Sequence, residues 1–207
     1  MVKSRLKSVF FLVFFFFSFQ SVFGQIKITN DQILKEVQQI KKVFSDSLKR
    51  YDFKKDEHLY SEKYRTFYSV KIESLSKLYQ DLYDRSVADV STLEKSGTSE
   101  NQTSDLQLGI EDIENGEQLK ELGLFLRTNY PAYLFSDYSS ATYRCKLNFL
   151  VDTDGKFKKV KYSGESLAFN LMTALFLYSI DHLEKPLRHN DQLIKQNFAQ
   201  PVTLVIE

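Results

Sequence analysis

The first pattern along the chain is helical and covers residues 30–93. Between residues 33 and 51, apolar side chains recur every three or four positions, and charged side chains fill the opposite face. The pair Asn30-Asp31 offers an N-cap in front of this run. A charged segment, residues 52–57, separates it from a second helical run that begins near Tyr60. The spacing therefore predicts two antiparallel amphipathic helices.

Tyrosines recur along the second predicted helix, at positions that include Tyr60, Tyr64 and Tyr79. Such a stripe has two interpretations. It is either a platform for a carbohydrate or peptide, or the edge of a core whose hydroxyl groups reach water.

The pattern changes after residue 94. Residues 95–115 combine serine, threonine and glycine with an acidic stretch, which is typical of a linker. A helix with an apolar face is expected over residues 117–127. Tyr130-Pro131 ends it, because the residue before a proline avoids the helical region.

Alternating positions then predict strands. Residues 143–151 alternate between apolar and polar side chains, which is the period of a strand. Residues 152–155, Asp-Thr-Asp-Gly, predict a tight turn in which the glycine takes positive φ. We expect the return strand over Phe157–Tyr162, a long helix over residues 165–182 and a final strand over Val202–Ile206.

These elements predict an α+β fold. We expect a helical hairpin in residues 25–94, a linker in residues 95–115, and a small domain in residues 116–207. In that domain a three-stranded antiparallel sheet packs against helices.

The helix expected over residues 165–182 is apolar around most of its surface. Its polar positions Asn170, Thr173 and Asp181 fall in one narrow stripe. A helix on one face of a small sheet needs only one apolar side, so a further layer should cover this helix. We expect the N-terminal helices to do so, with a homodimer as the alternative.

The N-terminus has the layout of a secretory signal peptide over residues 1–24. Lys3, Arg5 and Lys7 precede an apolar run, residues 9–19, and small or modest side chains precede Gln25. The alternative is an uncleaved anchor, but a spanning helix needs about 20 mostly apolar residues. The signal predicts export to the periplasm or cell envelope.

Composition narrows the classes of partner. Without residues 1–24 the chain has 25 basic and 27 acidic residues, a net charge of −2, which provides no general attraction to nucleic acid or anionic lipid. Cys145 is the only cysteine, so an intrachain disulfide is excluded. It lies in the alternating strand, where we expect a buried apolar side chain, with an intermolecular disulfide as the alternative.

Few arrangements in the sequence suggest catalysis. His58, His182 and His189 lack metal-ligand spacing, and residues 163–166, Ser-Gly-Glu-Ser, do not match a nucleophile elbow. Residues 152–155 share the start of a calcium loop but not its later oxygen ligands, which favours a plain hairpin turn. We therefore expect a protein that is not an enzyme, with no cofactor, metal or small-molecule substrate.

Several short motifs follow one another in residues 116–207. They are Tyr130-Pro131, the run Val-Asp-Thr-Asp-Gly-Lys over residues 151–156, Lys185-Pro186, and Pro201 at the last strand. In order and spacing this part of the chain resembles the C-terminal domain of TonB, in its Bacteroidetes-type form. The chain departs from the family in having no tryptophan beside Lys185-Pro186. It also lacks a long proline-rich spacer, which argues against a complete energy transducer.

The resemblance implies a binding module whose last strand receives an extended protein segment, such as that of an outer-membrane transporter. The matching residues are Val202, Thr203, Leu204, Val205 and Ile206, with Tyr130-Pro131 near the contact. The alternative is that these residues only build the sheet and its turn. The protein would then be a structural or assembly protein of the cell envelope that acts through its helical region.

Overall fold

The computed structural model describes residues 26–95, 108–134 and 141–206. The predicted signal peptide and residues 96–107 of the predicted linker lie outside the described residues. The helices are α2 (Asp31–Leu48), α3 (Glu57–Lys95), α4 (Glu117–Thr128) and α5 (Leu167–Ile180), with short 3-10 turns η1 (Ile110–Asp112) and η2 (Ala132–Leu134). The strands are β1 (Ala141–Val151), β2 (Phe157–Ser163), β3 (Arg188–His189), β4 (Gln192–Leu193) and β5 (Gln196–Ile206).

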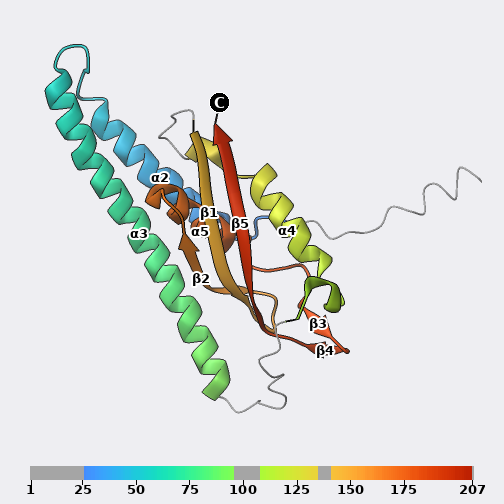
Figure 1. Ribbon diagram of the computed structural model, residues 1–207. Helices are drawn as coiled ribbons and strands as arrows, with labels where there is room; N and C mark the ends of the chain where they lie inside the picture. Colours follow the sequence, from blue (N-terminus) through green and yellow to red (C-terminus); the bar gives the residue numbers. More distant parts are fainter. Residues whose placement is uncertain (1–25, 96–107, 135–140, 207) are drawn as a thin grey trace, which may run out of the picture.

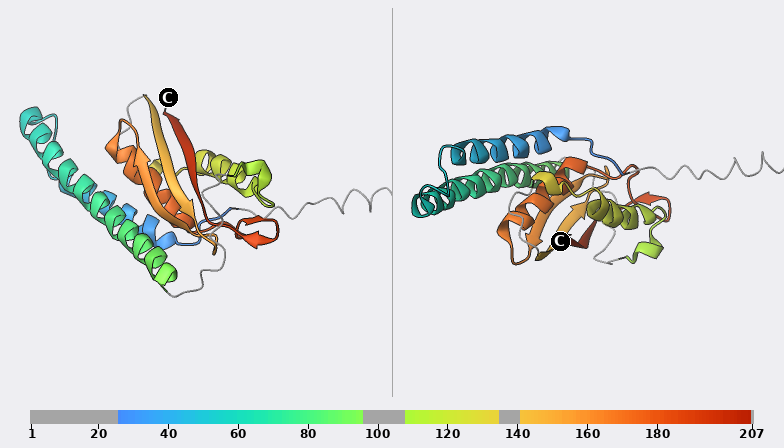
Figure 2. Two further views of the ribbon diagram at one scale, coloured as in Figure 1. Left: turned by 60° about the horizontal axis from the view of Figure 1, so that its bottom comes forward. Right: turned by 90° about the horizontal axis from the view of Figure 1, so that it is seen from above.

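Three strands form the main sheet, in the order β2-β1-β5, with both pairings antiparallel. Seen from above, α5 lies between this sheet and the α2–α3 hairpin, while α4 lies beside β5 (Figures 1 and 2). The predicted α+β class and its three-stranded antiparallel sheet are confirmed.

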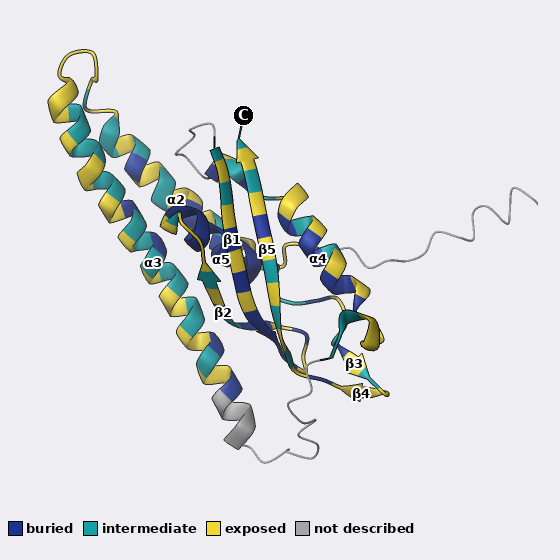
Figure 3. Ribbon diagram, in the orientation of Figure 1, coloured by how far each residue is buried: buried dark blue, intermediate teal, exposed yellow. Residues whose placement is uncertain are grey.

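Helix α5 is the centre of the core. Every residue from Ala168 to Ile180 is buried, which Figure 3 shows as an almost continuous dark segment. The sheet covers one side of α5, and α2 and α3 cover another, as the apolar surface of this helix led us to expect. The helix begins later than predicted, because Ser166 is the N-cap and its hydroxyl accepts a hydrogen bond from the Phe169 amide.

The polar stripe of α5 is buried as well. Thr173 donates its hydroxyl hydrogen to the Phe169 carbonyl at 2.7 Å, and Asn170 donates to the Gly164 carbonyl at 2.9 Å. Because backbone carbonyls accept these hydrogen bonds, the polar side chains can be enclosed without facing water.

The N-terminal helices form one hairpin that extends beyond the end of the sheet (Figure 1). Helix α3 is continuous over 39 residues, so it is about 58 Å long at 1.5 Å per residue. Asn30 precedes α2 as predicted, but its side chain makes no capping bond. Instead, the Thr29 and Asn30 amides donate to the Ser179 carbonyl, which joins the start of α2 to the end of α5.

The predicted hairpin turn between β1 and β2 is confirmed. Gly155 has φ of 80°, and its amide donates to the Asp152 carbonyl at 2.8 Å. Cys145, on β1, is 3% exposed and unpaired, in agreement with the expected buried apolar role.

Two predictions for the C-terminal segment are corrected. The final strand begins at Gln196 rather than Val202, and Pro201 lies inside it. An edge strand tolerates a proline whose missing amide would have faced outward. A small β3–β4 hairpin precedes it, unpredicted, whose turn residues Asn190 and Asp191 both have positive φ.

The end of the predicted linker packs against this hairpin region. Asn115 donates to the Pro186 carbonyl at 2.6 Å, and the Glu114 amide donates to the Arg188 carbonyl at 3.0 Å. Ile113 is buried in the core beside these contacts.

Candidate functional site: the two edges of the sheet

The edge of the sheet at β2 is closed by side chains from α3 and α5. The Tyr79 hydroxyl donates to the Val160 carbonyl at 2.9 Å, and the Val160 amide donates to the Tyr178 hydroxyl at 3.3 Å. The Lys159 amide donates to the Ser86 hydroxyl at 3.0 Å. These contacts satisfy backbone groups of Lys159 and Val160, so another strand cannot readily pair with this part of the β2 edge.

An irregularity in β2 makes these contacts possible. The pairing of β1 with β2 shifts between Asn148 and Leu150, and Lys159 has φ of 50°, which is the left-handed region. The shift is a β-bulge, and it turns backbone groups of consecutive residues toward the helices.

The opposite edge, at β5, is arranged differently. Strand β5 pairs with β1 alone, and Pro201 lies opposite Lys146 in an unbroken register. Proline has no amide hydrogen to donate, so Pro201 must occupy a position whose backbone faces away from β1. Residues of the same parity, which include Thr203 and Val205, therefore direct their amide and carbonyl groups to the free edge.

Only part of this edge is occupied by described residues. The Gln200 side chain donates to the Pro201 carbonyl at 3.0 Å. The Gln200 side chain also lies against α4, because a Cβ added to Gly123 would be only 2.9 Å from the Gln200 side-chain nitrogen. For Thr203 and Val205, no hydrogen bond joins the outward backbone groups to another described residue. The free edge therefore narrows to the last few residues of β5.

The structure separates the residues predicted to bind a partner. Thr203 and Val205 are exposed, the latter at 60%. Val202 is buried, and the side chains of Leu204 and Ile206 are half-buried against the core. Consequently only two of these five side chains lie on the face of the sheet that points away from α5, which we call the open face.

Tyr130 is half-buried and packs against the core. The Tyr130 ring packs against Phe169, with centroids 5.3 Å apart, and against Phe176 at 5.9 Å. Burial raises the pKa of the Tyr130 hydroxyl above its usual value. Pro131 is buried, so this pair supports the fold behind the sheet.

Sequence reasoning missed the charge of the open face of the sheet. Arg144 and Lys146 of β1 and Lys161 of β2 are exposed there, and none of the three main strands contains an acidic residue. The alternating pattern of residues 143–151 already placed Arg144 and Lys146 on one polar face. The missing information was the register that brings Lys161 and β5 beside them.

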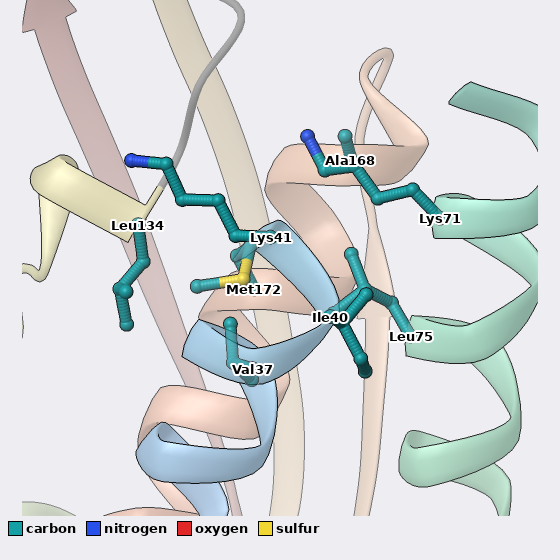
Figure 4. Close-up of a pocket in the computed structure, with 8 residues that line it drawn as sticks. All are labelled: Val37, Ile40, Lys41, Lys71, Leu75, Leu134, Ala168 and Met172. Atoms are coloured by element: carbon teal, nitrogen blue, oxygen red, sulfur yellow. The ribbon is translucent and has the colours of Figure 1, made fainter. Parts of the chain in front are cut away.

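An open hollow of about 400 Å³ lies near the end of α5 and is lined by Ile26, Lys27, Thr29, His182 and Glu184. The cavity in Figure 4 lies between α2, α3 and α5 and has a volume of about 10 Å³, room for about one water molecule. Val37, Leu75 and Met172 line it, while the amino groups of Lys41 and Lys71 point away from Val37. Within residues 26–95, 108–134 and 141–206, no three His, Cys, Asp or Glu side chains are grouped as metal ligands.

Asp181 and His182 follow the end of α5. The Asp181 carboxylate lies 3.0 Å from Nδ1 of His182, and Asp181 has φ of 71° where the helix stops. No hydrogen bond or ion pair connects this pair with a serine, cysteine or threonine among the described side chains, so it does not form a nucleophilic triad there.

None of the described helices is both long and apolar enough to cross a membrane. Comparison of the chain with protein-family models, with curated proteins and with solved structures gives no match.

Proposed function

We propose that this protein is an exported, non-enzymatic binding protein that takes an extended segment of a partner protein at the free edge of β5. The incoming segment adds a fourth strand to the sheet, and its backbone pairs with the outward groups of Thr203 and Val205. The resemblance to TonB-type domains suggests a segment of an outer-membrane transporter as the partner.

The observation that carries the proposal is the contrast between the two edges. Hydroxyl groups of Tyr79, Ser86 and Tyr178 occupy the β2 edge, whereas the described residues leave the end of β5 unpaired. Exposed edges invite pairing with other chains, and proteins commonly block the edges that they do not use. The unpaired end of β5 is therefore a candidate binding surface, since the opposite edge of the sheet is blocked.

Crosslinking from a photoreactive residue at position 203 tests the proposal in envelope extract. We expect a crosslink to a defined extended segment, identified by mass spectrometry, and a matched probe at Ser163 on β2 should not yield it. A transporter terminus in the product would support the suggested partner. Equal products from both positions, or none from position 203, would argue against binding at the β5 edge.

A second candidate is an assembly role for the α2–α3 hairpin. Val43 and Val70 are 54% and 52% exposed, and they line a groove of about 150 Å³ between the two helices. Phe53, at the tip of the hairpin, is 51% exposed. Loss of an envelope complex in a Val43→Ser/Val70→Ser variant, with β5 intact, would favour this role over strand addition.

A further inference from the structure

The open face beside β5 carries positive charge that no described residue balances. Arg144, Lys146 and Lys161 are exposed, and none forms an ion pair with a described side chain. Uncharged residues on this face include Thr142, Asn148, Ser163 and Thr203. The face is thus basic although the chain after residue 24 has a net charge of −2.

The register places two of these charges next to the free edge. Arg144 lies directly opposite Thr203, and Lys146 lies directly opposite Pro201. Directly opposed residues in a sheet have side chains on the same face. Since neighbouring strands are about 4.8 Å apart, a residue paired with Thr203 from outside would lie about 10 Å from the Arg144 backbone. Long arginine and acidic side chains can span that separation.

We propose that the segment received at β5 is acidic at alternate positions, with carboxylates that pair with Arg144 and Lys146 across the edge strand. This inference rests on the proposed strand addition and specifies the chemistry of the partner. Side chains that point to the open face would be aspartate or glutamate at positions i and i+2. The intervening side chains would face the side of α4, where Gln200 and Leu204 are half-buried, so small apolar side chains suit them.

Charge gives the segment selectivity more than it gives raw affinity. Exposed ion pairs each contribute little, but like charges placed opposite Arg144 and Lys146 would be repelled. A basic segment with the same backbone pairing should therefore bind least tightly, and added salt should reduce the difference.

Fluorescence anisotropy with three labelled ten-residue peptides tests the inference on the purified protein. The peptides alternate valine with glutamate, with glutamine or with lysine. At low salt we expect the glutamate peptide to bind about fivefold more tightly than the glutamine peptide, and the lysine peptide to bind most weakly. Sodium chloride at about 0.5 M should bring the three affinities together.

Four variants connect peptide binding with the named residues. Arg144→Gln/Lys146→Gln should reduce the glutamate preference to within about twofold, while Lys42→Gln, an exposed change on α2, should leave it intact. Thr203→Pro removes an outward amide and should weaken all three peptides, whereas Thr203→Val keeps that amide and should not. Circular dichroism of each variant checks that the fold is retained.

The outcomes separate the two ideas. If the glutamine and glutamate peptides bind equally and Thr203→Pro weakens both, strand addition stands and the acidic preference is wrong. If no peptide binds, or if Thr203→Pro leaves glutamate-peptide binding unchanged in a folded variant, strand addition itself is wrong and the inference falls with it.

Discussion

The Tyr79 hydroxyl lies 2.9 Å from the Val160 carbonyl and donates a hydrogen bond to it across 81 positions of sequence. This bond joins the long N-terminal helix to the bulge in β2. The Tyr178 hydroxyl meets the amide of the same valine, so both backbone groups of Val160 have side-chain partners. The helical hairpin is therefore part of the sheet domain's structure and leaves β5 as the open edge.

Loss of this bond should destabilise the protein. Tyr79→Phe removes the hydroxyl and leaves the Val160 carbonyl without its donor, which should lower the free energy of unfolding by about 1–2 kcal/mol. Urea denaturation measures the change. Tyr83→Phe is the matched control, because this half-buried tyrosine one turn later makes no side-chain hydrogen bond to a described residue. Equal losses in both variants would contradict the role assigned to Tyr79.

Removal of the Lys158 amino group should also lower the free energy of unfolding. Its side chain is 5% exposed, and its amino group lies 3.3 Å from the Asp89 carboxylate and 3.9 Å from that of Asp152. Lys158→Met leaves the buried Asp152 carboxylate without a nearby cation, and we expect a loss of about 3 kcal/mol in thermal or urea unfolding.

The double variant tests the cause of that loss. Lys158→Met/Asp152→Asn removes both charges, and much of the lost stability should return. Lys161→Met changes an exposed lysine on the same strand and should alter stability by less than about 0.5 kcal/mol. A double variant as unstable as Lys158→Met would indicate that packing rather than charge is responsible.

Gly164 allows β2, β1 and the start of α5 to approach closely. A Cβ at this position would lie 2.4 Å from the Arg144 carbonyl oxygen and 2.5 Å from the Asn170 side-chain oxygen. Because one of these atoms is backbone, Gly164→Ala should cost about 2 kcal/mol or more. Gly109→Ala is the control, since its new Cβ would meet mainly the movable Glu111 side chain. Similar denaturation midpoints for the two variants would refute the assigned close approach.

Because the Cys145 thiol is buried, the free energy of unfolding should decrease at alkaline pH. Burial raises the pKa of the Cys145 thiol from 9.0 to about 11, so the folded protein retains a proton that the unfolded chain releases. The stabilisation is complete below pH 9.0 and is lost as the pH rises toward about 11. In that window the stability difference between the native protein and Cys145→Ala should fall by up to about 1.4 kcal/mol per pH unit.

That comparison also controls for other groups. Every other titratable group is common to the native protein and to Cys145→Ala, so contributions that do not depend on the thiol cancel in the difference. Urea denaturation at several pH values provides the measurement. A difference that stays constant across the window would show that the thiol is not protected in the folded state.

Local patterns accounted for most of the secondary structure. The alternation of residues 143–151, the Asp-Thr-Asp-Gly turn and the long apolar helix all correspond to observed elements. The surplus apolar surface of that helix also led to the correct expectation that α2 and α3 would cover it. These features depend on periodicity and turn chemistry, which are local properties of a chain.

Local patterns were less informative where tertiary contacts decide. Pro201 suggested the start of a strand, whereas it lies within β5 because its backbone faces the free edge. The period of α5 placed Asn170 and Thr173 in one stripe, but not the backbone carbonyls of Gly164 and Phe169 that accept their hydrogen bonds in the core. The packing of the Tyr130 ring against Phe169 and Phe176 likewise joins residues that no local pattern relates.

The sequence alone determined most of the helices and strands, the turn between β1 and β2, and the need for a layer over α5, because hydrophobic period and turn residues act over short distances. Only the tertiary structure decided which edge of the sheet is open. That outcome depends on hydroxyls of Tyr79, Ser86 and Tyr178 reaching the β2 bulge, and on the register that sets Arg144 opposite Thr203. Such pairings join residues far apart in the chain, so no local pattern could specify them.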